Sequence, residues 1–293
     1  MNLTKITPNK IRWIWSNSVF RKNPVRTILR MIQWECARFS NKPVRCRFDG
    51  DHEVMLRVNE GASRLTHYFG NSEPETFEFM NDYLKPGMCV IDVGANIGLN
   101  AIWAARRVSP GGQVIAIEPD PSNFNRIVEN IGESQGLPIQ IYMAACGANI
   151  HQSLIVCHNS QDTSRSYVRT ASAIEADPTR PKMQIVTIDG IVSEMNLPKI
   201  HYLKIDVEGF EAEVLRGSMK SLYKNMIDIM QVELDNGMLQ RNDSSVSDIV
   251  DAIQSAGYEQ CNWDHHQKKF ARLSEKCNVF NSFFVLPGIL NTM

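Results

Sequence analysis

Met88-Cys-Val-Ile-Asp-Val-Gly-Ala-Asn-Ile-Gly98, followed by Gln113-Val-Ile-Ala-Ile-Glu-Pro-Asp120, is the stretch that decides the fold. An apolar run breaks at Gly94 and resumes at Leu99, which indicates a buried strand that turns into a helix. The glycines permit a tight turn and let backbone amides approach an anion at a helix N-terminus. The second strand ends in the acid Glu118, which can accept hydrogen bonds from both hydroxyls of a ribose.

The middle of the glycine turn separates two classes of nucleotide ligand. A nicotinamide site needs the pattern G-x-G-x-x-G so that pyrophosphate can touch the main chain, but here Asn96 replaces the second glycine. A nucleoside without phosphates fits better, and S-adenosylmethionine is one, with Asp92 as the nearest acid for its ammonium group. Alternatively, an α/β protein can carry an apolar strand, a glycine turn and a later acid without any cofactor.

The rest of the chain alternates strands and helices, which predicts an α/β, doubly wound, mostly parallel sheet. The expected elements are strand 89–93, helix 97–107, strand 113–118, helix 121–131, strand 139–144, and later strands at 200–206, 227–232, 258–263 and 281–286. Ligands of such sheets bind outside the carboxyl ends of the strands. The small residues Ala144 and Ala145 fall there, and they leave room for an adenine or simply allow the sheet to pack.

A group of charged residues follows the strand that begins at Ile200. With a two-residue period, Lys204, Asp206 and Glu208 share one side, and Glu233 ends the next apolar strand. Charges at the end of a buried strand are costly unless they are paired or used, which favours a functional site. The alternative is an ion pair of Lys204 with an acid that only closes the edge of the sheet.

Three motifs together resemble the FkbM family of S-adenosylmethionine-dependent methyltransferases. They are Val90-Ile-Asp-Val-Gly-Ala-Asn-Ile-Gly98, Ile117-Glu-Pro-Asp-Pro-Ser-Asn-Phe124 and Tyr202-Leu-Lys-Ile-Asp-Val-Glu-Gly-Phe-Glu-Ala-Glu-Val-Leu-Arg-Gly217, of which the third is the most specific. The resemblance covers residues 71–286. It implies a class I methyltransferase-like, Rossmann-like fold and O-methylation of a hydroxyl on a sugar, glycan or polyketide-type small molecule.

The resemblance and the pocket argument together predict two sets of site residues. S-adenosylmethionine is expected to contact Glu73, Asp92, Gly94, Ala95, Asn96, Gly98, Glu118, Pro119 and Ala145. The resemblance alone places Glu73 near the methionine end, and a helix cap formed by Ser72 with Glu75 is the alternative role for this segment. Catalysis is expected from Asp206, Glu208 and Glu233.

A weakly acidic hydroxyl needs help to attack a sulfonium methyl group. A positioned carboxylate can remove the proton, or a hard cation such as magnesium can lower the pKa of the hydroxyl. The predicted acids are suited both to proton removal and to magnesium binding, and Asp206 and Glu233 would be the magnesium ligands. The sequence leaves both mechanisms open.

Composition agrees with one catalytic domain and an extension. The chain has 293 residues, 43% of them hydrophobic, and a formal net charge of -1. We expect a basic cap of a helix and a hairpin at 1–70 and a cofactor-binding core at 71–290, with a loop insertion at about 158–182. Seven cysteines without a C-x-x-C pair indicate reduced thiols and no zinc site. With no apolar stretch of membrane-spanning length, the chain is expected to be soluble and cytoplasmic.

The first 47 residues carry eleven Lys or Arg and a single acid, Glu35. One interpretation is a basic arm that lies on anionic lipid or nucleic acid, with Trp13, Trp15 and Trp34 interleaved. The other, which we favour, is a cap whose helical face packs on the catalytic core through Ile28, Leu29, Ile32 and Ala37. A hairpin should follow, with strands 44–48 and 54–58 around a turn at Asp49-Gly50-Asp51.

The polar run 158–182 is long for a connection and is interpreted as a substrate gate, or else as a surface excursion without a chemical role. Its cations Arg165, Arg169, Arg180 and Lys182 are suited to an anionic acceptor. His201, His265 and His266 are expected to be structural or merely exposed. The competing functions are a nicotinamide-dependent oxidoreductase and a nucleic-acid or membrane-surface binding protein that uses the basic N-terminus; for the methyltransferase interpretation no nucleic-acid partner is expected.

Overall fold

A computed structural model describes residues 12, 14–15, 17–132, 136–148, 154–158, 166–170, 183–273 and 280–290. These residues form two compact units, one up to Pro74 and the other from Glu75 onward. The predicted boundary at residue 70 stays a prediction. Trp13 and, from the predicted gating loop, residues 159–165 and 171–182 lie outside the described residues.

The first unit combines a hairpin with helices. Its elements are α2 (Ser18–Lys22), α3 (Pro24–Phe39), β1 (Val44–Asp49), β2 (His52–Leu56) and α4 (Gly61–Phe69). β1 and β2 pair antiparallel around Gly50, as the Asp-Gly pair predicts, with a bulge between Arg47 and Asp49. Asn23 caps α3 by accepting a hydrogen bond from the Arg26 amide at 3.1 Å, and Pro24 occupies the first helical position.

The buried side of α3 is not the side that the sequence pattern suggested. Thr27 and Trp34 are the buried residues of the helix, and the Trp34 ring lies 5.5 Å from the His67 ring of α4. Ile28, Leu29 and Ile32, which were expected to pack on the core, are exposed. Within the first unit, the buried position of the helix is taken by the large indole of Trp34, on the opposite side. Packing of Ile28, Leu29 and Ile32 on the catalytic core stays a prediction.

The second unit is built on an eight-stranded mixed sheet in the order β13-β12-β14-β11-β10-β3-β4-β5. The strands are β3 (Cys89–Val93), β4 (Gln113–Ile117), β5 (Ile139–Tyr142), β10 (Ile200–Ile205), β11 (Ile227–Glu233), β12 (Glu259–Asp264), β13 (Lys269–Arg272) and β14 (Asn281–Val285). β5, β4, β3, β10 and β11 run parallel, while β14, β12 and β13 are joined by antiparallel pairings. The sheet is thus doubly wound and mostly parallel, as predicted.

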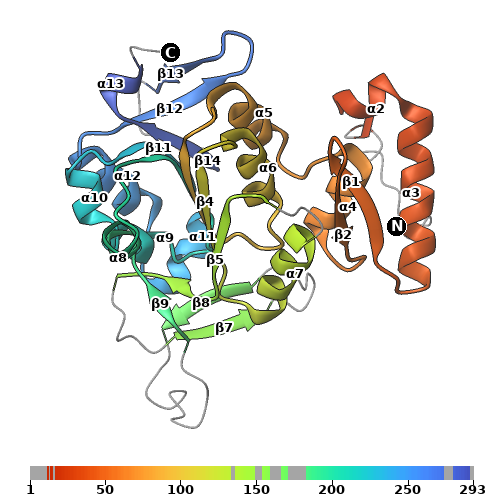
Figure 1. The fold of residues 1–293 in the computed structure, drawn as a ribbon, viewed down its shortest axis with the longest axis horizontal. Coiled ribbons are helices and arrows are strands. Elements are labelled where there is room, and N and C mark those ends of the chain that lie inside the picture. The colour runs from red at the N-terminus through yellow and green to blue at the C-terminus, as the bar shows by residue number, and fades with distance from the viewer. Residues whose placement is uncertain are drawn as a thin grey trace. The chain divides into compact units, whose positions relative to one another are not determined.

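Helices cover the sheet on both faces, which explains why its central strands are mostly apolar and buried. Figure 1 shows α6 and α7 on one side and α8, α9 and α12 on the other. The helices of this unit are α5 (Pro74–Tyr83, beginning at the boundary), α6 (Leu99–Val108), α7 (Pro121–Gly132), α8 (Ile188–Glu194), α9 (Glu211–Arg216), α10 (Met219–Tyr223), α11 (Asn236–Leu239), α12 (Val246–Ser255) and α13 (Pro287–Leu290), with a 3-10 turn at Gln240–Asn242. Every residue of β3 and of β11 is buried.

Four short strands of the second unit lie outside the central sheet, and one of them corrects a sequence expectation. β5 ends at Tyr142 rather than at residue 144, and Ala145–Cys146 form a separate strand, β6, paired in parallel with β9 (Ile185–Val186). A second pair, β7 (Leu154–His158) and β8 (Ser166–Thr170), is antiparallel. Ala145 therefore belongs to a small accessory sheet instead of ending a strand of the main one.

The order of the strands defines where a ligand should bind. From β3 the chain moves outward through β4 to β5, and it later returns to the other side of β3 with β10 and β11. The carboxyl ends of β3 and β10 therefore flank the point where the winding direction reverses. In doubly wound sheets such a switch point opens a crevice for ligands.

Candidate active site

The turn after β3 adopts left-handed backbone conformations. The φ angles are 84° at Gly94, 53° at Asn96 and 86° at Gly98. The Gly94 amide donates to the carbonyl oxygen of Ile117 at 2.9 Å, which ties the turn to the end of β4. A Cβ atom at Gly94 would stand 1.8 Å from the carbonyl oxygen of Asp206, so only glycine fits. The glycine turn and the end of β10 are therefore in direct contact.

Glu118 links this turn to the loop after β4. One carboxylate oxygen accepts from the Asn96 amide at 2.8 Å, and the other accepts from the Asp120 amide at 3.0 Å and the Asn123 side chain at 3.5 Å. Burial, at 3% exposure, raises the pKa of Glu118 to about 8, while the hydrogen bonds from Asp120 and Asn96 act in the opposite direction. A carboxyl group in this state gains from further hydrogen-bond donors that stabilise its ionised form.

Two more buried polar groups adjoin the turn. The Oδ1 atom of Asn96 is buried and accepts no hydrogen bond within the described part of the chain. Asp92, in β3, is 2% exposed and lies opposite Lys204 in the register of β3 and β10. A buried acceptor without a donor, such as the Asn96 Oδ1 atom, costs about 1–3 kcal/mol. The donor-rich ammonium and ribose of S-adenosylmethionine are chemically suited to these oxygens.

The second half of the site is a cluster of acids at the ends of β10 and β11. Asp206 follows β10, Glu233 ends β11, and a side-chain hydrogen bond joins the two carboxyl groups. Burial raises the pKa of Glu233 well above its usual range, and the charges of Asp206 and then Glu208 raise it further, while Lys204 acts in the opposite direction. Burial and the neighbouring acids therefore favour the protonated form of Glu233.

Lys204 supplies the positive charge of this cluster. Its ammonium group is 3% exposed and lies 2.6 Å from a carboxylate oxygen of Asp206. Glu208 takes the left-handed conformation, with a φ of 55°. The contact of Lys204 with Asp206 agrees with the sequence prediction that these two share one side; the place of Glu208 beside them and the catalytic role of the acids stay predictions. Within the described ranges, no three His, Cys, Asp or Glu side chains are grouped to hold a metal ion.

Glu211, to which the sequence analysis gave no role, holds the loop between Asp206 and α9. One of its carboxylate oxygens accepts from the Val207 amide at 3.2 Å and from the Gly209 amide at 3.1 Å. Burial raises the pKa of Glu211 to about 7, and those amide bonds lower it. The signal was an acid in the first turn of the helix after a glycine loop, where a carboxylate can bind loop amides.

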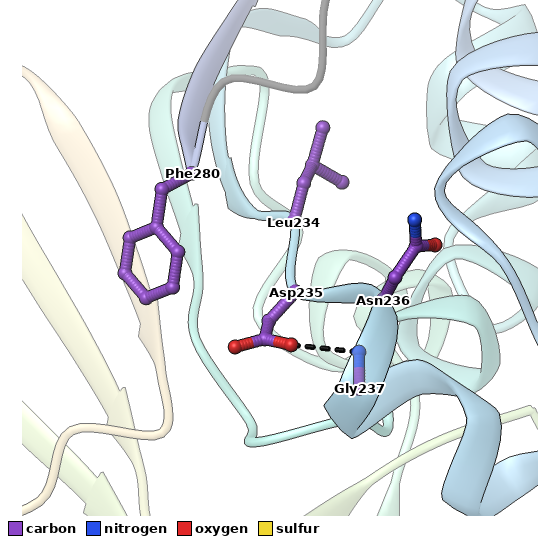
Figure 2. Close-up of a pocket in the computed structure, with 5 residues that line it drawn as sticks. All are labelled: Leu234, Asp235, Asn236, Gly237 and Phe280. Atoms are coloured by element: carbon purple, nitrogen blue, oxygen red, sulfur yellow. Dashed lines mark hydrogen bonds between the residues drawn. The ribbon is translucent and has the colours of Figure 1, made fainter.

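A pocket of about 310 Å³ lies immediately beyond the acid cluster along the chain, and Figure 2 shows its lining. Leu234, Asp235, Asn236 and Gly237 follow Glu233 directly and line the pocket with Phe280. The Leu234 amide donates to the Phe280 carbonyl at 2.7 Å, which extends the pairing of β11 with β14 by one residue. The Phe280 side chain, half exposed, is thereby anchored beside the strand end that carries Glu233.

Asp235 has two distinct oxygens in this pocket. One accepts from the Gly237 amide at 2.7 Å and from the Met238 amide at 3.2 Å, which caps α11. Figure 2 shows the other oxygen directed away from Gly237, toward the side on which Phe280 lies. An aromatic side chain and a carboxylate oxygen therefore border the same pocket.

The remaining predicted cofactor residues are placed less directly. The Ala95 amide donates to the Ile117 carbonyl at 3.1 Å, and Pro119 follows Glu118 in the loop after β4. Ala145 is fully buried in the accessory sheet. Glu73 belongs to the first unit, so its predicted place near the cofactor stays a prediction.

The histidines have structural contacts. His201 accepts a hydrogen bond from the Cys89 amide at 2.9 Å, at the opposite ends of β3 and β10 from the acids. His265 lies 3.3 Å from Glu78, and the His266 amide donates to Asp264 in a turn. The expectation that His201 is structural agrees with its bond.

A family model and two relatives match part of this chain. A family model, "Methyltransferase FkbM domain", matches residues 92–259. The chain is 29% identical over 153 residues to "Hexuronic acid methyltransferase AglP" of Haloferax volcanii, covering 50% of this chain and 56% of the relative. It is 26% identical over 161 residues to "Methyltransferase 1" of Beauveria bassiana, covering 50% and 64%. The chain thus spans less than two thirds of either relative.

Among solved structures, the chain is similar to methyltransferase FkbM from Methylobacillus flagellatus. The identity is 14%, the TM-score is 0.43, and the match covers 91% of this chain and 60% of that one. The mixed, mostly parallel sheet is the α/β, class I methyltransferase-like fold that the motifs predicted. The family model spans more than half of the sequence, from Asp92 to Glu259, and includes the glycine turn and both acid-bearing strand ends; the chain belongs to the FkbM methyltransferase family.

Proposed function

We propose that this protein is an S-adenosylmethionine-dependent O-methyltransferase whose acceptor is a hydroxyl group of a sugar, glycan or polyketide-type small molecule. One observation carries the proposal: the Gly94 turn touches the backbone of Asp206. A turn suited to the cofactor and a set of carboxylates suited to proton removal thus adjoin at the switch point of the sheet.

The buried polar groups at the glycine turn fit the cofactor. Glu118 would accept from the ribose hydroxyls, Asp92 would face the ammonium group, and the amides of the turn would approach the methionine carboxylate. The cofactor, when bound, supplies an electrophilic methyl group on a sulfonium. Asn96 stands where a nicotinamide site needs glycine, so NAD is the natural competing ligand for a test.

The paired carboxyl groups of Asp206 and Glu233 would take the proton of the acceptor hydroxyl. The raised pKa of Glu233 favours its protonated form, and the Lys204 ammonium group lies 2.6 Å from the Asp206 carboxylate and offsets its charge. The hydroxyl oxygen would form its bond to the methyl carbon as the methyl–sulfur bond breaks and leaves a thioether, and Asp206 would take the hydroxyl proton. The pKa values of two coupled carboxyl groups depend on each other, so the strength of the pair as a base is set by their interaction.

Magnesium is the alternative means of activating the hydroxyl. Asp206 and Glu233 would be its protein ligands, and magnesium commonly binds one or two carboxylates with water or substrate oxygens completing the shell. Activity that survives a chelator would favour the carboxylate base, and activity restored only by magnesium would favour the metal.

The pocket bordered by Phe280 and Asp235 would hold the acceptor. The face of an aromatic ring is electronegative and attracts the weakly positive C–H groups of a sugar ring, and a carboxylate oxygen accepts from ring hydroxyls. One relative is named for hexuronic acid. Because the Asp235 carboxylate lines this pocket, we propose an uncharged, hydroxyl-rich acceptor for this chain.

The first experiment is calorimetric titration with S-adenosylhomocysteine, with NAD as the competing ligand. Micromolar binding that Glu118→Ala weakens supports the cofactor assignment, and a preference for NAD contradicts it. Transfer to a panel of neutral sugars and uronic acids then follows. Asp206→Asn should keep cofactor affinity and lose transfer, whereas the control Asp251→Asn, at an exposed position of α12, should keep both.

A further inference from the structure

The outer face of α3 carries apolar side chains that the fold leaves in solvent. Val25, Ile28, Leu29 and Ile32 are 67%, 46%, 61% and 55% exposed. Their spacing of three, four and seven residues places them on one side of the helix. Phe39, at the end of the helix, is 96% exposed and lies on the same side by the 100° step of an α-helix. The stripe therefore runs along the whole of α3.

This apolar face is not used to fold the first unit. The helix packs on its own unit through the opposite side, where Thr27 is 2% exposed and Trp34 is fully buried against His67 and Tyr68. An amphipathic helix normally turns its apolar stripe inward. An apolar stripe that remains exposed after the unit has folded indicates an interaction surface.

The charges around the stripe indicate what it contacts. Residues 1–47 carry eleven Lys or Arg against one acid; Arg21 and Lys22, at the end of α2, and Arg26, in the first turn of α3, are exposed. Trp15, just before α2, is 62% exposed and its ring packs against Phe20. Two copies of this chain that paired through the stripe would bring like charges together. Anionic phospholipid headgroups would instead meet these cations with opposite charge.

We propose that α3 lies in the plane of an anionic membrane surface, with its Val25, Ile28, Leu29 and Ile32 side chains among the acyl chains and with Arg21, Lys22 and Arg26 at the headgroups. Helices of this kind, apolar on one face and rich in Lys and Arg beside it, insert to a depth of about 5–10 Å. The 16 residues of α3 extend about 24 Å along the surface. No helix in the described part of the chain is long and apolar enough to cross a membrane, so the contact is peripheral.

The test is sedimentation of the full-length chain with vesicles. One set contains equal parts of phosphatidylglycerol and phosphatidylcholine, and the other contains phosphatidylcholine alone. We expect binding to the anionic set that weakens as salt rises. Leu29→Glu and Ile32→Glu should each weaken binding at least about tenfold, and Arg26→Gln should weaken it about fivefold.

Tyr223→Glu is the matched control, because Tyr223 is 59% exposed on α10 and Leu29 is 61% exposed. It should leave vesicle binding unchanged. Because Leu29 is exposed and outside the active site, Leu29→Glu should also leave the melting temperature and S-adenosylhomocysteine binding as in the wild type, which separates this proposal from the proposed function. Absence of binding to the anionic vesicles would overturn the proposal. So would a Leu29→Glu variant that melts at a lower temperature or changes its molar mass by light scattering, because the stripe would then be covered by protein.

Discussion

Replacing Glu118 with Gln is expected to remove a steep dependence of stability on pH. In the folded chain, burial raises the pKa of this carboxyl from 4.5 to about 8. Between pH 4.5 and about pH 8, the Glu118 carboxyl has lost its proton in the unfolded chain but still holds it in the folded chain. The unfolded state therefore binds fewer protons, and the free energy of unfolding falls as pH rises through this window.

The magnitude follows from the linkage relation. Each unit of pKa difference corresponds to about 1.36 kcal/mol. Integrated from about pH 6 to about pH 8.5, the shift of Glu118 removes about 2.5 kcal/mol from the free energy of unfolding. Gln has the same shape and does not ionise, so a Glu118→Gln chain should lose none of this amount.

The assay is urea unfolding at both pH values without cofactor, for wild type and for Glu118→Gln. Other buried acids also titrate in this range, since burial raises the pKa of Glu211 to about 7. Their contribution cancels when the pH effect on the variant is subtracted from that on the wild type. Equal pH effects in the two proteins would refute the reasoning, because Glu118 would then be ionised throughout, with its amide hydrogen bonds outweighing its burial.

Four further outcomes are expected. Below pH 8, the affinity for S-adenosylhomocysteine should rise by up to about tenfold per pH unit in calorimetry, because ribose binding favours the ionised form of Glu118, and the dependence should vanish in Glu118→Gln. Gly94→Ala should lower stability in thermal melts by about 3 kcal/mol or more, because the added Cβ meets both a positive φ and a clash at 1.8 Å. The control Gly87→Ala, with a φ of 89° and no neighbour within 4 Å, should lose only about 1–2 kcal/mol. Equal losses would contradict the close contact at Gly94. Glu211→Ala should cost about 2 kcal/mol or more in urea unfolding, since it leaves two loop amides without an acceptor, and Glu211→Gln should recover most of that loss. Trp34→Ala should cost the first unit about 3–5 kcal/mol, followed by circular dichroism on heating, and a loss below 1 kcal/mol would argue against its burial.

The sequence alone determined the central architecture. An apolar strand, a glycine turn and an acid after the next strand are local patterns, and they predicted β3, β4 and the place of Glu118 at the end of β4; the contact of Glu118 with the turn came from the structure. The parallel order followed because strands and helices alternate along the chain. The sequence also predicted that Lys204 and Asp206 would share one side of their strand, since side chains alternate with a period of two.

Only the tertiary structure decided the contacts between segments far apart in the chain. The hydrogen bond between Asp206 and Glu233 exists because β10 and β11 are parallel neighbours whose carboxyl ends coincide. Glu211 binds loop amides because the loop before α9 folds back over the first turn of that helix, where Glu211 lies. Within the first unit, the α3 side that carries Trp34 is buried against α4, and the side that carries Ile28 and its neighbours is left exposed. Periodicity shows which residues of a helix share a face, but packing selects the face that is buried.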